Sequence, residues 1–260
     1  MRNSRAPVPD AAFLVNAEVK NFRLSDLTTL RAKLEEGRMH RRRIVVIESV
    51  SALTGRTAPL AEILALTKLF NADLVVDESS AIGGCGLRGA GASDTIPLRD
   101  VMAIVVDLGL GLASFGAAVV GSQTLIRYLL QRSRTFIGET PLPAAIAAAA
   151  ESGLDLIELR SAARERLALL ALRLRSGLKS LRLIDDEFGE SPIIGIPFSK
   201  SSTADSFARA LFERNFYVEV VAVPLPLNEG AIVRILLNSA HSDQTVSGLL
   251  DACTVASRLA

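Results

Sequence analysis

Short apolar runs alternate along the chain with amphipathic segments, as strands and helices do in an α/β protein. The β-branched runs Arg43–Val50 and Asp73–Asp77 predict two buried strands. Between them, Pro59–Phe70 begins with proline and carries apolar residues three and four positions apart, which predicts a helix. This strand–helix–strand repetition favours an α/β fold with a mostly parallel sheet.

The segment Val101–Gly121 is long and apolar enough to approach the length of a membrane span. However, Asp107 and several glycines interrupt it, and its β-branched residues gather towards its two ends. We therefore expect two buried strands, Val101–Val106 and Ala117–Val120, joined by a Gly-rich turn, rather than a membrane helix. The helices expected after this segment are Leu125–Gln131, Pro143–Glu158 and Arg160–Ser180.

A second unit is expected to begin near Leu181. Its predicted strands are Ile193–Pro197, Tyr217–Val221 and Ile232–Leu237, and its predicted helices are Thr203–Arg214 and Ser242–Arg258. The expected organisation is an irregular segment over 1–18, a large domain over 19–158, a connecting helix over 159–180 and a small α/β domain over 181–260.

Composition narrows the range of functions. The net charge of +1 gives no sign of a nucleic-acid partner bound by bulk electrostatics. Two cysteines and two histidines supply neither a disulfide framework nor a histidine-based metal site. Residues 1–10 lack the apolar core of a secretory signal. Lysine is scarce, and none lies between Lys68 and Lys179.

Polar residues follow three of the expected strands, at the edge where open α/β sheets bind their ligands. They are Glu48-Ser49, Asp77–Ser80 and Asp107. A carboxylate there can hold a cationic ring nitrogen, a metal or a ribose, or can simply cap the next turn, and the pattern leaves these alternatives open. The glycines of Gly83–Gly91 do not open into a helix, so a flexible surface loop is favoured over a phosphate-binding loop.

Six short motifs occur in an order and spacing that resemble the α-oxoamine synthases. They are Glu48, Thr54-Gly55, Pro59–Ile63, Asp77-Glu78, Phe136–Pro143 and Arg234–His241. That family consists of fold-type I pyridoxal-phosphate (PLP) enzymes that condense an amino acid with an acyl-CoA. The resemblance runs from about Val19 to the C-terminus. It implies a fold-type I PLP-transferase with a partial, N-terminally truncated large domain and a small C-terminal α/β domain.

The departures from the family pattern concern its reactive groups. Alignment on Gly116 and Gly121 puts Leu110 at the position of the family's Schiff-base lysine. Without that amine, PLP cannot be held covalently and substrate proton transfer loses its base, so no catalytic residue is expected here. Ser80 replaces a histidine beside the ring, and Val223 replaces an arginine for the substrate carboxylate. Asp77, which in this family pairs with the pyridinium nitrogen, is retained.

The lysine-free branch that the chain resembles is the non-catalytic first subunit of eukaryotic serine palmitoyltransferase. Ser79, Leu112–Gly116 and Ala144–Ala150 carry this resemblance. It implies a heterodimer with a lysine-bearing subunit that condenses L-serine with palmitoyl-CoA to 3-ketosphinganine. PLP would be bound by that partner, and Thr140 would reach the partner's cofactor phosphate across the interface. The alternative is that Thr140 merely starts the helix that follows Pro143.

The same resemblance implies a location at the cytoplasmic face of the endoplasmic reticulum. Membrane contact would come only through the complex or through a missing N-terminal helix. Two alternatives remain open. One is an active PLP-dependent acyltransferase of the same family, and the other is a decayed stand-alone protein without cofactor. The cofactor-binding residues expected from the resemblance are Asp77, Ser80 and Thr140.

Overall fold

The computed structural model describes residues 7–185, 189, 191–222 and 230–259 as two compact units. The large unit comprises Asn3–Ser49 and Ala58–Arg160, and the small unit comprises Val50–Thr57 and Ser161–Ala260. The helix expected to connect two domains over 159–180 therefore belongs mainly to the small unit. Val50–Thr57, which lies early in the sequence, belongs to it as well.

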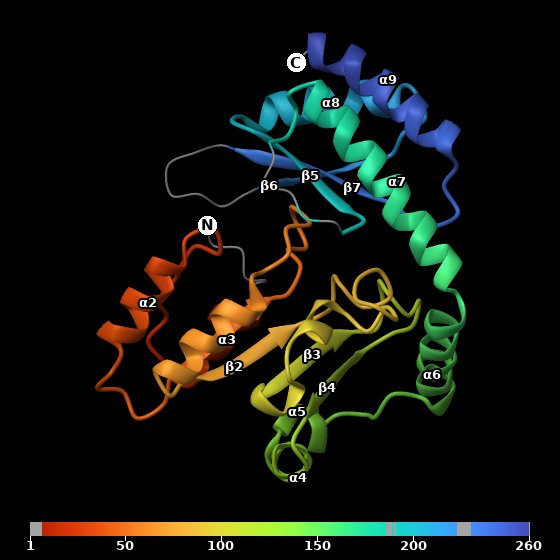
Figure 1. Ribbon diagram of the computed structural model, residues 1–260. Coiled ribbons are helices and arrows are strands. Elements are labelled where there is room, and N and C mark those ends of the chain that lie inside the picture. Colours follow the sequence, from red (N-terminus) through yellow and green to blue (C-terminus); the bar gives the residue numbers. More distant parts are fainter. Residues whose placement is uncertain (1–6, 186–188, 190, 223–229, 260) are drawn as a thin grey trace. The chain divides into compact units, whose positions relative to one another are not determined.

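A four-stranded sheet forms the centre of the large unit (Figure 1). Its strands, in spatial order, are β1 (Ile44–Glu48), β2 (Asp73–Asp77), β3 (Ala103–Asp107) and β4 (Ala117–Gly121). β1, β2 and β3 run parallel, whereas β4 is antiparallel to β3. The predicted mostly parallel sheet is confirmed.

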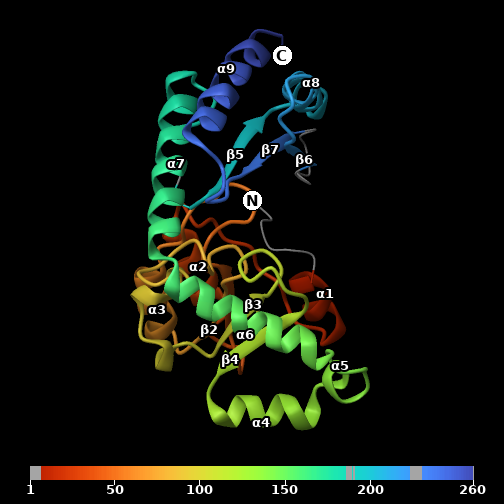
Figure 2. The same cartoon turned by 90° about the vertical axis from the view of Figure 1, so that its right-hand side faces the viewer.

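Six α-helices of the large unit lie in the described residues (Figures 1 and 2): α1 (Pro7–Leu14), α2 (Leu27–Glu36), α3 (Leu60–Leu69), α4 (Gln123–Arg132), α5 (Arg134–Ile137) and α6 (Ala144–Leu159). Two 3-10 helices, η1 (Ala92–Thr95) and η2 (Leu98–Asp100), precede β3. The apolar spacing in α3 buries Leu60, Ile63 and Leu64 on one face. Helix α1 lies within the segment that the sequence suggested to be irregular.

Burial across the large sheet falls off at β4. Val76 in β2 is fully buried, and Ile104 in β3 is 8% exposed, but Val119 and Val120 in β4 are 42% and 53% exposed. The expectation of two buried strands over 101–121 is therefore confirmed for β3 and wrong for β4. β4 is one of the two edge strands of this sheet, and no described strand pairs with its outer side. In the part of the chain that the structure describes, no helix combines the length and apolarity needed to cross a membrane.

The small unit is built on an antiparallel sheet with the order β5 (Ile193–Phe198), β7 (Ala231–Leu236), β6 (Glu219–Ala222). Helices α7 (Ser161–Ser180), α8 (Ser201–Phe212) and α9 (Asp243–Leu259) gather on it in Figure 1. Their apolar sides share one core with the strands, which includes Leu170, Leu174, Leu178, Ile194, Phe207, Leu211, Val233 and Val246. The predicted small α/β unit is thus present.

The segment Val50–Thr57 is held within the small unit by hydrogen bonds from Ser191, just before β5, and from Arg234 in β7. Ser191 Oγ donates to the Gly55 carbonyl over 3.0 Å, and Arg234 Nη1 donates to the Ala52 carbonyl over 3.1 Å. Gly55 has a φ of 71°, and a Cβ there would lie 1.8 Å from the Ile193 carbonyl oxygen. Position 55 therefore requires glycine for two reasons: the backbone of β5 comes too close for a Cβ, and the φ angle is positive.

We predict that Leu174→Ala lowers the free energy of unfolding by about 2–5 kcal/mol, because the fully buried side chain would leave a cavity in the core of the small unit. Leu172→Ala, on the same helix but 63% exposed, should change it by about 0.5 kcal/mol or less. Urea unfolding of both variants measures the difference. Equal losses would show that α7 is not packed as described.

Candidate functional site

The carboxyl ends of β1, β2 and β3 lie side by side and carry the candidate site. Ser49 N–H donates to the Asp77 carbonyl over 2.9 Å, and Glu78 N–H donates to the Val105 carbonyl over 2.8 Å. Pairing thus continues one residue past the ends of the strands. The structure confirms that polar residues predicted at three strand ends meet at one edge.

Glu78 is the most buried carboxylate at this edge, with 1% of its surface exposed. Its Oε2 accepts from Ser49 Oγ at 2.7 Å and from the backbone N–H of Ala92 at 3.0 Å. Its Oε1 accepts from the N–H of Ser93 at 2.6 Å. Three donors from two other segments therefore stabilise a carboxylate that would be costly to bury alone.

This carboxylate also shapes the Gly-rich segment that follows β2. Gly91 has a φ of 103°, and a Cβ there would lie 2.5 Å from Glu78 Oε2. Across the segment, Gly83 N–H donates to the Gly89 carbonyl over 2.8 Å, which closes a turn. The segment ends in the four-residue η1 and not in an α-helix, so it lacks the geometry of a phosphate-binding loop.

Sequence reasoning placed Glu78 in the family motif but missed its role as the centre of this network. The available signal was an acidic residue directly after a buried strand, followed by a glycine whose replacement would collide with it. The predicted surface loop is exposed only at Gly86–Arg88 and Ala90 within 83–91.

Asp77 and Asp107 are oriented by backbone amides. Asp77 Oδ1 accepts from Ser79 N–H at 2.9 Å, and Asp107 Oδ1 accepts from Gly109 N–H at 2.8 Å. Ser79 Oγ accepts from Asp107 N–H at 2.9 Å, which joins the end of β2 to the end of β3. Ser80, at the predicted histidine position, is 8% exposed.

Leu110 lies on the turn between β3 and β4 and is 55% exposed. Ser114 N–H closes this turn by donating to the Leu108 carbonyl over 3.0 Å. A Cβ at the neighbouring Gly111 would lie 2.4 Å from the Ile82 carbonyl oxygen, so the turn packs closely on the start of the Gly-rich segment. The predicted lysine position therefore does lie beside the strand-end network, but it carries an apolar side chain.

Every lysine of the large unit forms an ion pair away from this edge. Lys20 and Lys33 both pair with Glu36 on α2, at 3.1 and 3.0 Å. Lys68 pairs with Asp100 at 2.6 Å. Asp100 lies before the start of β3 and Leu110 lies after its end, so the two residues are at opposite ends of this strand. No lysine of this unit thus replaces the missing amine.

These residues do not fit covalently held PLP. Asp77 is a half-buried carboxylate that suits a pyridinium nitrogen. Yet Leu110 has no amine, and Asp107, at the start of the same turn, carries an exposed carboxylate. Val223, which was expected at the carboxylate-binding position, lies outside the described residues.

Thr140 lies in the exposed stretch between α5 and α6. The helix α6 begins after Pro143 without a side-chain cap, so the alternative that Thr140 merely starts this helix is not supported. A Cβ at Gly116 would lie 2.7 Å from Leu142 Cδ1, which places the end of this stretch against the start of β4. The structure records no hydrogen bond from Thr140 to the strand-end network within the described residues.

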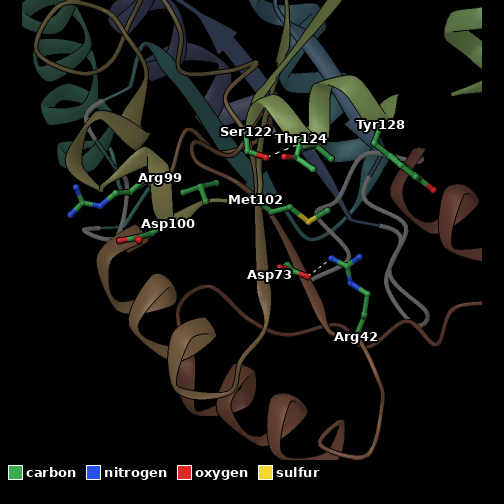
Figure 3. A pocket seen from close by; sticks show the side chains of 10 residues that line it. Arg42, Asp73, Arg99, Asp100, Met102, Ser122, Thr124 and Tyr128 are labelled. Carbon is green, nitrogen blue, oxygen red and sulfur yellow. Dashed lines mark hydrogen bonds and ion pairs between the residues drawn. The ribbon is translucent and has the colours of Figure 1, made fainter. Parts of the chain in front are cut away.

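A separate hollow of about 640 Å³ lies at the opposite, amino edge of the sheet (Figure 3). Its lining includes Arg42, Asp73, Asp100, Met102, Thr124 and Tyr128. Arg42 Nη2 bonds Asp73 Oδ2 at 2.7 Å, and this hydrogen bond raises the pKa of Arg42 above its ordinary value. This hollow contains none of the residues predicted to hold a cofactor.

Comparison with known proteins agrees with this architecture. The family model for class I and II aminotransferases matches residues 7–252. An 8-amino-7-oxononanoate synthase from Methylococcus capsulatus is 35% identical over 254 residues, which cover 96% of this chain and 65% of that protein. The structure of Sphingomonas wittichii serine palmitoyltransferase superposes with a TM-score of 0.90 at 25% identity, covering 99% of this chain and 65% of that one.

The parallel sheet, its antiparallel edge strand and the strand-end aspartate define the fold of a fold-type I PLP-transferase. Within that class, the chain belongs to the class I and II aminotransferase family, and its relatives are α-oxoamine synthases. One similar solved structure, with a TM-score of 0.89 and 25% identity over 99% of this chain and 65% of that one, is described as SPT with a PLP internal aldimine. The chain spans about two thirds of the length of these relatives.

We predict that Glu78→Ala lowers the free energy of unfolding by about 3 kcal/mol or more, because one hydroxyl and two buried amides would lose their acceptor. Trypsin should then cut faster at the exposed Arg88 in the loosened Gly-rich segment. Asp94→Ala, which removes an exposed carboxylate from the adjoining η1, is the control and should change stability by about 0.5 kcal/mol or less. Similar behaviour of the two variants would contradict the assigned role of Glu78.

Proposed function

We propose that this chain is a non-catalytic subunit that supports a lysine-bearing α-oxoamine synthase partner. The observation that carries this proposal is Leu110, an apolar side chain on the β3–β4 turn where the family's chemistry needs an amine. The lysines of the large unit are engaged elsewhere, so none supplies a substitute. The strand-end network is nevertheless intact around Asp77 and Glu78.

For the partner's reaction, we propose the condensation of L-serine with palmitoyl-CoA to 3-ketosphinganine. The motif resemblance to the lysine-free subunit of serine palmitoyltransferase supports this reaction, as does the similarity to solved serine palmitoyltransferases. In that role the complex would act at the cytoplasmic face of the endoplasmic reticulum. A second candidate is support of an 8-amino-7-oxononanoate synthase, which is favoured by the 35% identity to a curated enzyme of that name.

Co-expression with a lysine-bearing homologue tests the proposal. We expect a stoichiometric complex whose turnover exceeds that of the homologue alone. Assays for 3-ketosphinganine and for 8-amino-7-oxononanoate then separate the two candidate reactions. A chain that neither binds the homologue nor changes its turnover would favour a stand-alone protein without cofactor.

We predict that the chain incubated with PLP forms no covalent PLP–lysine bond, because Leu110 has no amine and Lys68 is held in its ion pair with Asp100. Borohydride reduction followed by peptide mass spectrometry measures this. A PLP-modified lysine peptide at stoichiometric yield would instead favour an active enzyme. The Leu110→Lys variant is expected to show no turnover. Ser80 would still replace the family's histidine beside the PLP ring, and Val223 would still replace its arginine for the substrate carboxylate.

We predict that Thr140→Val weakens PLP binding by the lysine-bearing partner about tenfold or more, because a hydroxyl that donates to a phosphate contributes a charge-assisted hydrogen bond. Equilibrium titration of the co-expressed complex with PLP gives the affinity. Thr135→Val is the matched control, since its exposed hydroxyl bonds only Ser133 at 2.9 Å among the described residues. Unchanged affinity in the Thr140 variant would remove Thr140 from the partner's site.

A further inference from the structure

The outer side of helix α7 carries apolar residues that the core of the small unit does not use. The inner side of α7 packs into that core through Leu170, Leu174 and Leu178, which are all buried. Leu169 and Leu172 lie on the other side of the helix and are 66% and 63% exposed. Figure 2 shows α9 and β5 on one side of α7, and these two elements leave its leucine-bearing outer side uncovered.

The two exposed leucines belong to a line of exposed residues with regular spacing. This line runs along most of α7, and we call it the α7 stripe: Ala162, Glu165, Leu169, Leu172, Ser176 and Lys179. Its members alternate between steps of three and four residues, which is the spacing of the a and d positions of a coiled coil. Such a spacing keeps one line of side chains towards a neighbouring helix. The α7 stripe therefore has the form of a helix-pairing surface with leucines at its centre.

Two arginines fix the rotation of α7 about its own axis. Arg173 Nη1 donates to Asp243 Oδ1 at 2.5 Å and its Nη2 donates to Ser247 Oγ at 2.7 Å, and both acceptors are on α9. Arg175 Nη2 donates to the Ile193 carbonyl of β5 at 2.8 Å. Because these hydrogen bonds reach two different neighbours, α7 cannot turn its exposed leucines into the core.

The charges of the α7 stripe favour a second copy of the same helix that runs in the opposite direction. Glu165 lies near the amino end of the stripe and Lys179 lies at its carboxyl end. An antiparallel pair brings the acidic end of each copy towards the basic end of the other, and it also opposes the two helix dipoles favourably. A parallel pair would instead place like charges beside each other at both ends, which is unfavourable.

We propose that the α7 stripe binds the α7 stripe of a second copy of this chain, as an antiparallel pair of helices. The pair is centred between Leu169 and Leu172, so that each of these leucines packs against the other one of the second copy. A two-fold axis relates the copies, and both therefore use the same surface. Only two layers of the pair are formed by leucine, so the expected association is weak, with a dissociation constant on the order of 0.1 mM.

This inference goes beyond the proposed function and does not rest on it. The α7 stripe lies in the small unit, whereas the strand-end site and Leu110 lie in the large unit. Self-association through α7 needs no lysine-bearing partner and no cofactor. A chain that fails to bind such a partner would therefore leave this proposal intact, and the two proposals can fail separately.

Cross-linking at the two ends of α7 tests both the contact and its direction. The full-chain variants Ala162→Cys and Ser180→Cys are mixed at about 0.1–1 mM, the range in which a weak dimer is populated. A short bifunctional thiol reagent is added, and mass spectrometry identifies the linked peptides. Antiparallel pairing should join position 162 of one copy to position 180 of the other. Two residues at position 162 should not be joined, because they would lie about 25 Å apart at 1.5 Å per residue.

Two outcomes of this experiment would overturn the proposal. One is the absence of any linkage between positions 162 and 180. The other is linkage between two residues at position 162 that equals or exceeds the 162–180 linkage, because it would indicate a parallel pair or random collision. Links that involve Cys85 or Cys253 are identified by their own peptides and are counted separately.

Two substitutions added to both cysteine variants locate the contact. Leu169→Lys should lower the yield of the 162–180 link about tenfold or more, because it places a charge in each central layer of the pair. Val255→Lys on α9 is the matched control, since Val255 is also exposed in the small unit but lies outside the α7 stripe, and it should leave the yield unchanged. Both changes are at exposed positions, and circular dichroism should show that both variants are folded. Equal yields from the two variants would contradict the proposal.

Discussion

The buried carboxylate of Glu78 is the constraint on which the carboxyl edge of the large sheet depends. A carboxylate with 1% exposure is tolerable only when charge-assisted hydrogen bonds replace its hydration, and here a serine after β1 and two amides of η1 provide them. The end of β1, the end of β2 and the Gly-rich segment must therefore close together. Asp77 and, through Ser79, Asp107 take their positions from that closure.

The same edge shows that the scaffold and the chemistry of this family depend on different residues. Leu110 is more than half exposed on its turn, so an amine or an alkyl group there makes little difference to folding. The motifs assign Glu78 no part in the family's cofactor chemistry, yet three hydrogen bonds at this edge depend on it. Leu110 is thus compatible with an intact network of hydrogen bonds at the strand ends.

Much of the fold was predictable because β-branched runs and helical spacing reflect local backbone preference, and β2 was placed at Asp73–Asp77 without error. Burial was less predictable. Val119 and Val120 have the apolarity of a core strand, but a pattern of side chains cannot report whether another element covers them. The helix at Pro7–Leu14 was missed since its apolar residues show little one-sided periodicity. The fastening of Val50–Thr57 to the small unit depends on long-range contacts such as Arg234 with Ala52.

For the site, the structure places Asp77, Ser80 and Leu110 at one edge of the sheet, because strand ends in a parallel sheet converge by geometry; their roles toward a cofactor stay a prediction. Thr140 is different in kind, since its proposed target belongs to another chain and its own surroundings give no reason for a hydroxyl. The exposed residues of β4 and α4 extend that distinction. Strand-end residues are satisfied within the chain, whereas Val120 and the arginines of α4 have no described partner that uses their chemistry. The buried network around Glu78 therefore fixes the strand-end residues, and it leaves the exposed side chains of β4 and α4 outside its hydrogen bonds.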